Sequence, residues 1–249
     1  MKSYIQKKLK AYYLRAQYRP RIVDCIINPF FIIRRGLFVC FRKKAPLLKG
    51  NILDFGCGRK PYESLFTNAQ SYLGVDVHHH DPNFDKYVNA DVLYDKHTLP
   101  FESESFDHCF SSEVIYLIEK PDEIISELHR VIKKNGLILI SAPFLWDENW
   151  TQYDFCRYTS SGFRKILERN GFEVLEEEKT PSHFATIWQC FLSFIYENPC
   201  TQWKALRLLF TLVIIAPLNI LGIIVNFVLP NRKNKQTLYH STIILARAL

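Results

Sequence analysis

A glycine-rich turn and the carboxylate in front of it are the residues of this sequence best suited to chemistry. The segment Asn51–Tyr62, NILDFGCGRKPY, is a short apolar run with Asp54 near its end, followed by Gly-Cys-Gly at residues 56–58. Glycines let a backbone adopt positive φ and approach a ligand closely. The pattern predicts a strand, a tight turn and a helix over residues 61–67, which together open a nucleotide-binding βαβ unit.

A second carboxylate lies where the next strand is expected to end. Asp76 comes near the end of the apolar run Ser71–Val77, 18 residues after Gly58. At the tip of a neighbouring strand, such an acid can accept hydrogen bonds from both hydroxyls of a ribose. The turn is not the dinucleotide fingerprint G-x-G-x-x-G, because Pro61 stands in the place of the third glycine, and no G-K-[ST] closes it as in a P-loop.

The order of motifs resembles that of the class I S-adenosylmethionine-dependent methyltransferases, in particular a bacterial methyltransferase type 11-like subgroup. The acidic-x-G-x-G core of their motif I reads Asp54–Gly58 here, with Lys-Pro-Tyr following at residues 60–62. Leu-Pro-Phe at 99–101 and Ser-Phe-Asp at 105–107 match the passage before the fourth strand of that family. Residues 127–144, ELHRVIKKNGLILISAPF, match the passage from its fourth helix to its fifth strand, with Lys-Asn where Pro-Gly is usual.

This resemblance implies the fold. We expect an α/β protein with a doubly wound, Rossmann-like, mostly parallel sheet of seven strands, formed by a core over residues 50–181 and a last strand within 239–249. Beyond the first two strands, the pattern predicts strands at 107–111, 137–142, 172–177 and 242–246, and helices at 122–133, with Asn135-Gly136 as a left-handed cap, and at 161–170. The last strand is expected to pair with residues 172–177.

The resemblance also implies S-adenosyl-L-methionine as the cofactor. By motif, Asp54 shapes the turn near the methionine part, Asp76 binds the ribose, and Asp91, near the end of the third strand, binds the adenine amino group. The other expected cofactor contacts are Gly56, Cys57, Gly58, Val77, Val92 and Ser111.

The acceptor side of the site follows the fourth and fifth strands. No Asn-Pro-Pro-Tyr or Asp-Pro-Pro-Tyr is present, which disfavours methylation of a DNA amine, and we expect transfer to oxygen. Relatives often carry Glu-His where Tyr116-Leu117 stand here. A hydroxyl acceptor would use a general base, and the candidates are Glu113, Asp154 and His183.

The loop at residues 143–159, PFLWDENWTQYDFCRYT, leaves the edge where open α/β sheets bind ligands. By resemblance to an Asp-Tyr-x-Arg-Tyr-Thr sequence it covers the acceptor. Asp154 and Arg157 either line the acceptor pocket or brace the loop as an ion pair. The residues assigned to this acceptor loop are Trp150, Tyr153, Arg157 and Tyr158.

Charge is unevenly spread over the 249 residues. The formal net charge is +7, yet residues 1–49 hold 13 Lys or Arg and a single acid. This leader mixes cations with large apolar residues, and Asn28-Pro29 is expected to divide it into two helices. It is either an amphipathic element on anionic lipid or a cover over the core; its apolar content disfavours nucleic acid as a partner.

An apolar insert over residues 182–238 departs from a minimal methyltransferase. Residues 208–229 carry no charge and are long enough to cross a membrane, but Pro217-Leu218-Asn219 is expected to divide them. Because the last strand must return to the sheet, the insert should enter and leave a membrane on one side. We expect monotopic membrane contact at the inner face of the cytoplasmic membrane; a hydrophobic cap or a homodimer face is the alternative.

The remaining composition excludes other classes. Apolar residues at 48% and aromatic residues at 14% exclude disorder. Seven scattered cysteines without a C-x-x-C pair indicate reduced thiols in the cytoplasm, and residues 1–21 are too charged for a secretory signal. His78-His79-His80-Asp81 are expected to be exposed loop residues, with no metal bound, because adjacent side chains seldom converge on one ion.

Three functions are compatible with these features. The first is methyl transfer to a small-molecule, glycan or lipid-linked acceptor at the membrane surface. The second is a non-catalytic membrane-surface binding protein on a methyltransferase scaffold. The third, a nicotinamide enzyme, lacks the third glycine.

Overall fold

The computed structural model describes residues 2–77, 88–95, 98–148, 152–197, 203–229 and 236–249. The chain forms two compact units. One, here called the sheet unit, consists of Cys40–Lys179 and Ser241–Leu249; the other, the helical unit, consists of Met1–Val39 and Thr180–His240. The leader and the insert, which the sequence presents as separate segments, therefore contribute to the same unit.

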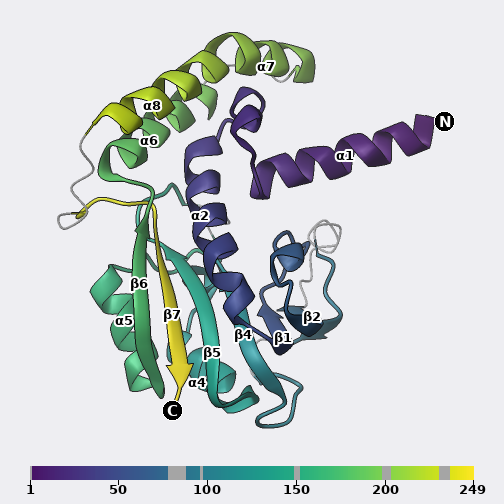
Figure 1. Ribbon diagram of the computed structural model, residues 1–249, viewed down its shortest axis with the longest axis vertical. Coiled ribbons are helices and arrows are strands. Elements are labelled where there is room, and N and C mark those ends of the chain that lie inside the picture. Colours follow the sequence, from purple (N-terminus) through teal and green to yellow (C-terminus); the bar gives the residue numbers. More distant parts are fainter. Residues whose placement is uncertain (1, 78–87, 96–97, 149–151, 198–202, 230–235) are drawn as a thin grey trace. The chain divides into compact units, whose positions relative to one another are not determined.

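The sheet has seven strands in the order β3-β2-β1-β4-β5-β7-β6 (Figure 1). β1 is parallel to β2 and β4, β2 to β3 and β4 to β5, whereas β7 is antiparallel to β5. The predicted sheet, with its last strand beside the one that begins at Phe172, is confirmed. The strands are β1 (Gly50–Phe55), β2 (Ala69–Val77), β3 (Val92–Tyr94), β4 (Phe106–Ser112), β5 (Ile132–Pro143), β6 (Phe172–Thr180) and β7 (Ser241–Ala248).

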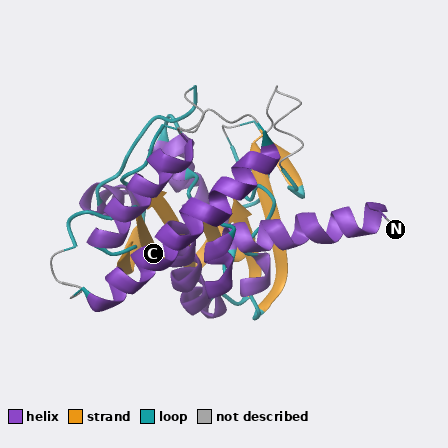
Figure 2. Ribbon diagram, turned by 90° about the horizontal axis from the view of Figure 1, so that it is seen from above, coloured by secondary structure: helices purple, strands orange, loops and turns teal. Residues whose placement is uncertain are grey.

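The main core of the sheet unit lies under two helices, α4 (Pro121–Val131) and α5 (Ser160–Arg169), which pack on each other and on the strands. Figure 2 shows the elements from above, with strands in orange. Successive side chains of a strand point to opposite faces. Cys109 belongs to this core, so its neighbour Phe110 faces the other way, where it packs edge-on against Phe41 and Tyr62.

Two local predictions in this unit are wrong. A helix was expected over residues 61–67, but the chain forms turns and a single 3-10 turn, Glu63–Leu65. Residues 56–68 must turn twice between β1 and β2, and Lys60 takes a left-handed φ of 50°, which a helix does not allow. Asn135 is left-handed as expected, with φ 66°, but it lies in β5 because α4 already ends at Val131.

The helical unit contains α1 (Lys2–Tyr18), the first part of α2 (Phe31–Lys44), α6 (His183–Glu197), α7 (Lys204–Phe210) and α8 (Ala216–Val228). A π-helical turn, Thr211–Ile215, joins α7 to α8. The chain is therefore helical throughout residues 204–228, and the predicted division at residues 217–219 is wrong. Pro217 falls in the first turn of α8, where a missing backbone N–H is tolerated.

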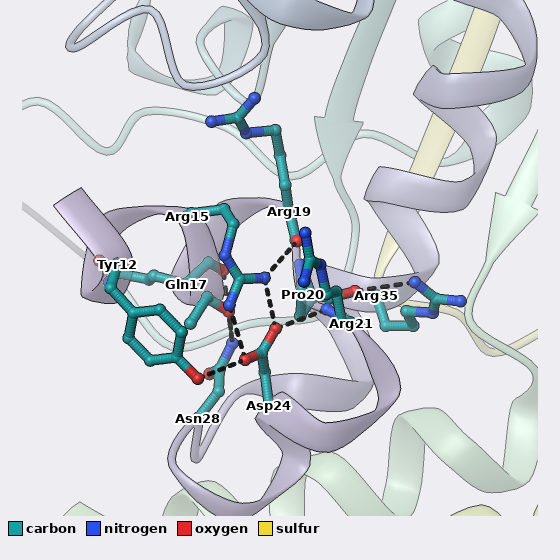
Figure 3. A network of polar contacts seen from close by, with 10 residues as sticks. Tyr12, Arg15, Gln17, Arg19, Pro20, Arg21, Asp24, Asn28 and Arg35 are labelled. Atoms are coloured by element: carbon teal, nitrogen blue, oxygen red, sulfur yellow. Dashed lines mark hydrogen bonds and ion pairs between the residues drawn. The ribbon is translucent and has the colours of Figure 1, made fainter.

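The leader divides into two helices as expected, with a 3-10 turn, Ile22–Ile26, between them. Asp24 in this turn is fully buried and holds the two parts of the leader together (Figure 3). Its carboxylate accepts two hydrogen bonds from Arg15, at 2.7 and 2.8 Å, and one from the backbone N–H of Arg21 at 2.6 Å. The Tyr12 hydroxyl donates a further bond at 3.2 Å.

Two buried amides join the leader to the insert. Asn219 of α8 donates from Nδ2 to the carbonyls of Cys25 and Asn28, at 2.8 and 3.0 Å. Gln189 of α6 donates to the carbonyl of Pro29 at 2.9 Å and accepts from the N–H of Ile32 at 3.1 Å. These bonds satisfy backbone groups at the break in the leader, where no helix can pair them.

Candidate cofactor and acceptor site

The glycine turn after β1 has the positive-φ backbone that its glycines predict. Gly56 and Gly58 adopt φ values of +68° and +50°. A Cβ added to Gly56 would lie 2.4 Å from a methyl group of Val114, because the segment after β4 packs directly on the turn. A Cβ added to Gly58 would meet nothing within 4 Å. The backbone at Gly58 therefore faces open space that a ligand can fill.

Asp54 lies near the end of β1, next to the glycine turn. Its side chain is buried, and its Oδ2 accepts a hydrogen bond of 2.7 Å from the Tyr72 hydroxyl. Burial raises the pKa of Asp54 to about 7, although the bond from Tyr72 acts in the opposite direction. Asp54 is therefore tied to the neighbouring strand β2, and its role in shaping the turn near the methionine part stays a prediction.

Asp76 caps the same turn from the neighbouring strand. Its Oδ2 accepts from the backbone N–H of Gly58 at 2.8 Å, and its Oδ1 accepts from the N–H of Val77 at 2.8 Å. The acid thus lies beside the one glycine of the turn that faces open space.

The pKa of the Cys57 thiol depends on all three predicted cofactor-binding aspartates. Burial raises the pKa of this thiol well above its ordinary value, and the charges of Asp54, Asp76 and Asp91 raise it further, while Lys60 opposes them. All three acids therefore lie near the turn. A buried thiol among carboxylates stays protonated, so Cys57 packs in the turn and does not act as a nucleophile.

Asp91 is placed differently from the prediction. It precedes β3, which begins at Val92, so the prediction that it lies near the end of the third strand is wrong. Its carboxylate accepts a 2.7 Å bond from the N–H of Gly74 and pairs with Lys60. Partial burial acts against them, but these two partners hold the pKa of Asp91 below its ordinary value. The acid that directly follows β3 is Asp95.

The predicted strand contacts of the cofactor have well-defined places. Val77 and Val92 lie in paired strands, opposite Tyr94 and Val75 respectively. Ser111 in β4 is fully buried, and its hydroxyl has no hydrogen-bond partner among the described residues. A buried hydroxyl without a partner is uncommon in native proteins, and it lies two residues before Glu113 at the end of β4.

Glu113 is held at the carboxyl edge of the sheet. Its backbone is left-handed, with φ 57°, which a glutamate adopts only when its surroundings enforce it. Oε1 accepts from the hydroxyl of Ser141 in β5 at 2.7 Å, and Oε2 accepts from the hydroxyl of Ser241 in β7 at 3.0 Å. Both serines are fully buried. The carboxylate is thus oriented by two further strands.

The acceptor loop is braced by the ion pair that the sequence left open. Asp154 and Arg157 form a bidentate pair in which the Asp154 side chain is 2% exposed. Arg157 also lies over the ring of Tyr116, 5.1 Å from its centre, and donates to the carbonyl of Asp147 at 3.0 Å. A carboxylate held in this way is a poor proton acceptor, so the structure favours bracing over catalysis for Asp154.

The other acceptor candidates are dispersed. Tyr158 is buried in the main core and stacks on Phe163, and its contact with the acceptor stays a prediction. Tyr153 is half-buried in the loop, and Trp150 lies outside the described residues. His183 is the exposed first residue of α6 and belongs to the helical unit.

The described part of the chain contains no group of His, Cys, Asp and Glu side chains that could hold a metal ion. His78, His79, His80 and Asp81 lie outside the described residues.

Comparison with known proteins agrees with this geometry. Residues 53–140 match a family model described as a methyltransferase domain. The matched segment begins in β1, includes the glycine turn and ends in β5. The leader and the insert lie outside it.

Curated relatives carry the same assignment. An uncharacterized chloroplastic methyltransferase of Arabidopsis thaliana is 24% identical over 153 residues, which cover 54% of this chain and 41% of the relative. An uncharacterized methyltransferase of Mycobacterium tuberculosis is 30% identical over 102 residues, covering 39% and 40%. The chain thus spans about two fifths of the length of these relatives.

Solved structures share the fold at low identity. The [4+2]-cyclase SpnF is 18% identical with a TM-score of 0.52, covering 84% of this chain and 80% of its own. A Bacillus halodurans protein assigned as a methyltransferase is 17% identical with a TM-score of 0.52, covering 85% and 99%. The chain therefore has the class I methyltransferase fold. Because a cyclase shares this fold, the chemistry has to be argued from the site itself.

Sequence reasoning missed the partners that fix the site residues. Tyr72 on Asp54, Lys60 on Asp91, and Ser141 and Ser241 on Glu113 all come from neighbouring strands or the turn. Once β5 and β7 are known to be neighbours, the register places Ser241 at the end of β5. No local pattern around Ser241 could have identified it.

Proposed function

We propose that this protein is an S-adenosylmethionine-dependent methyltransferase that transfers the methyl group to an acceptor oxygen. The observation that carries the proposal is the glycine turn of the methyltransferase domain, which opens at Gly58 beside the carboxylate of Asp76. When bound, the cofactor supplies a methyl group on a positively charged sulfur. The protein then has mainly to hold the acceptor, the methyl carbon and the sulfur in line.

The described residues fit this cofactor. Asp76 would bind the ribose hydroxyls as their hydrogen-bond acceptor, and the absence of a side chain at Gly58 lets the nucleoside approach the backbone. Asp91 is the adenine contact that the family motif proposes, and Asp95, just past β3, is the alternative that the strand boundaries add. Titration of Asp91→Asn and Asp95→Asn with the cofactor separates them, because the contact residue loses affinity and the other does not.

Glu113 is the strongest candidate for a general base among the three predicted ones. It directly follows β4, at the edge where the parallel strands present ligands, and its carboxylate is oriented by Ser141 and Ser241. A hydroxyl acceptor placed against it would lose its proton to Glu113 as the methyl group is transferred. The two serine bonds would orient the carboxylate for this step.

The acceptor that we propose is a lipid-linked molecule or glycan at the inner surface of the cytoplasmic membrane. Two features support it: the apolar side chains that α7 and α8 expose, and the position of Ser241. This residue contacts Glu113 and is also the first residue of the sheet after the insert. The insert is thus joined in the chain directly to a residue that contacts the proposed base.

The test is transfer of a labelled methyl group. The full-length protein is incubated with methyl-labelled S-adenosylmethionine and cell-envelope extract from cells that lack the protein, and label is counted in the lipid and glycan fractions. We expect incorporation with the wild type and with Glu123→Ala, an exposed surface control on α4, and a large loss with Asp76→Asn. No incorporation above a protein-free blank, together with no cofactor binding, would favour a non-catalytic surface-binding protein on this scaffold.

A further inference from the structure

The packing of α8 is inverted relative to a helix of a water-soluble protein. The three residues that α8 buries are Ala216, Asn219 and Gly222, of which none has a large apolar side chain. Gly222 lies so close to the indole of Trp188 in α6 that an added Cβ would be 2.3 Å from it. Trp188 also donates from Nε1 to the carbonyl of Leu218 at 3.0 Å. Small residues and polar bonds at the contact are how helices pack in lipid.

The large apolar side chains point outward instead. The most apolar 18-residue stretch of helix Ala205–Val228 has a mean hydropathy of 2.7, yet only 28% of this stretch is buried inside the protein. Phe227, which is 90% exposed, shows the pattern most clearly. Exposed members of this outward face include Leu209, Val213, Ile220, Ile224 and Val228. α6 extends the face with Ile187, Phe191 and Phe194. Monomeric soluble proteins rarely expose so continuous an apolar surface.

The distribution of charge between the two units indicates what kind of surface this apolar face contacts. The helical unit contains 14 Lys or Arg against two acids, whereas the sheet unit contains 18 against 23. The whole positive excess of the chain is therefore carried by the unit with the exposed apolar helices. Arg207 lies over the ring of Tyr196, and Trp203, just before α7, is 74% exposed. Aromatic and cationic side chains beside an apolar surface are typical of the boundary between water and an anionic membrane.

The strand order fixes how the insert can meet a membrane. The chain leaves the sheet after β6 and returns in β7, and these two strands are neighbours in one sheet. A single crossing by residues 205–228 would place β7 on the opposite side of the membrane from its partners. The N–H of His240 bonds to the carbonyl of Thr180 at 3.1 Å, so the two ends of the insert meet. The insert must enter and leave on the same side.

From these four observations we infer that α6 and the continuous helix of α7 and α8 form a hairpin that embeds its outward face in the hydrocarbon of one leaflet of an anionic membrane. The partner is a lipid bilayer surface, and the leader belongs to the same anchor because Asn219 and Gln189 bond its backbone to the hairpin. This inference goes beyond methyl transfer, because membrane binding by the helical unit can be tested independently of cofactor binding and catalysis by the sheet unit.

Flotation of the full-length protein with vesicles tests the anchor. The vesicles contain equal parts of phosphatidylglycerol and phosphatidylcholine, or phosphatidylcholine alone. The probe variant is Ile224→Glu with Phe227→Glu, two exposed positions whose change leaves the buried contacts of α8 intact. The matched control is Leu47→Glu, which changes an exposed apolar residue of the sheet unit. Each buried Ile or Phe side chain is worth about a tenfold factor or more, so the double variant should lose about a hundredfold in partitioning.

We expect the wild type and Leu47→Glu to float with the anionic vesicles and less well with the neutral ones, and the double variant to remain at the bottom. Analytical sedimentation without lipid tests the alternative, in which a second copy of the chain covers this apolar face. If the wild type does not float but forms a dimer that the double variant dissociates, the face belongs to a second copy of the chain and the inference is overturned. It is also overturned if the double variant floats as well as the wild type.

Discussion

The core of the sheet unit and the last helix of the helical unit bury opposite kinds of residues. The core of the sheet unit is made of large apolar side chains such as Phe55, Ile125 and Phe163, and its charged surface faces water. The last helix of the helical unit buries Ala216, Asn219 and Gly222 and exposes Leu, Ile, Val and Phe. Apolar content alone therefore does not tell a core from a surface. What distinguishes them is the size and polarity of the residues at the buried contacts.

Matched phenylalanines give the largest expected contrast between the units. Phe163→Ala in α5 empties a fully buried site and should lower the free energy of unfolding by about 3–5 kcal/mol. Phe227→Ala removes a side chain that is 90% exposed and should change it by less than about 0.5 kcal/mol without lipid. Hydrogen exchange resolved by unit measures both. Equal losses at the two positions would mean that Phe227 is buried in solution.

Asn219 of α8 offers a second test of the contrast between the units, with a smaller expected loss of stability. Asn219→Leu makes α8 still more apolar, but it leaves the carbonyls of Cys25 and Asn28 without their donor inside the helical unit. We expect a loss of about 1–3 kcal/mol in that unit and faster proteolysis of the leader. Ile220→Asn is the control, because it introduces an amide side chain at the next position of α8, which is exposed. A variant as stable as the wild type would show that the amide does not hold the leader.

The buried acids of the two units should respond to pH in opposite directions. In the sheet unit the pKa of Asp54 is raised, so its contribution is present at acidic pH and is lost as the pH rises towards and through about 7. In the helical unit burial acts against it, but Arg15 and the N–H of Arg21 hold the pKa of Asp24 below its ordinary value. Its contribution is therefore present at neutral pH and lost in acid.

The slope from one such acid is at most about 1.4 kcal/mol per pH unit. Hydrogen exchange in each unit as a function of pH measures it, and Asp54→Asn should flatten the dependence in the sheet unit between roughly pH 4 and 7. Asp24→Asn should affect only the helical unit, there at low pH. Parallel pH profiles in the two units would contradict these environments.

The sequence predicted the parts of the fold that local patterns encode. The glycine turn and the stripe of α4 follow from residue type and period, the seven-stranded sheet was implied by the family resemblance, and all three are confirmed. Contacts between distant residues were not predictable in this way. Ser241 bonds to Glu113 across 128 residues, and Asn219 bonds to Cys25 across 194. In the sequence Asn219 suggested a break in the insert, because its partners belong to a segment that periodicity cannot bring beside it.

The position of Asp91 in its strand was predicted wrongly for a different reason. Its motif was identified by resemblance, but whether an acid begins or ends a three-residue strand depends on register with β2, which no local signal sets. Tyr158 was assigned to the acceptor by the same resemblance, and the start of α5 at Ser160 draws it into the core, where it stacks on Phe163.

Equilibrium titration of the purified protein with S-adenosylmethionine tests the central claim most directly. The account predicts saturable binding at one site per chain, weakened at least about tenfold by Asp76→Asn through loss of charge-assisted bonds to the ribose, and unchanged by Glu123→Ala. Absence of binding by the wild type, or equal binding by wild type and Asp76→Asn, would contradict a cofactor site at the glycine turn.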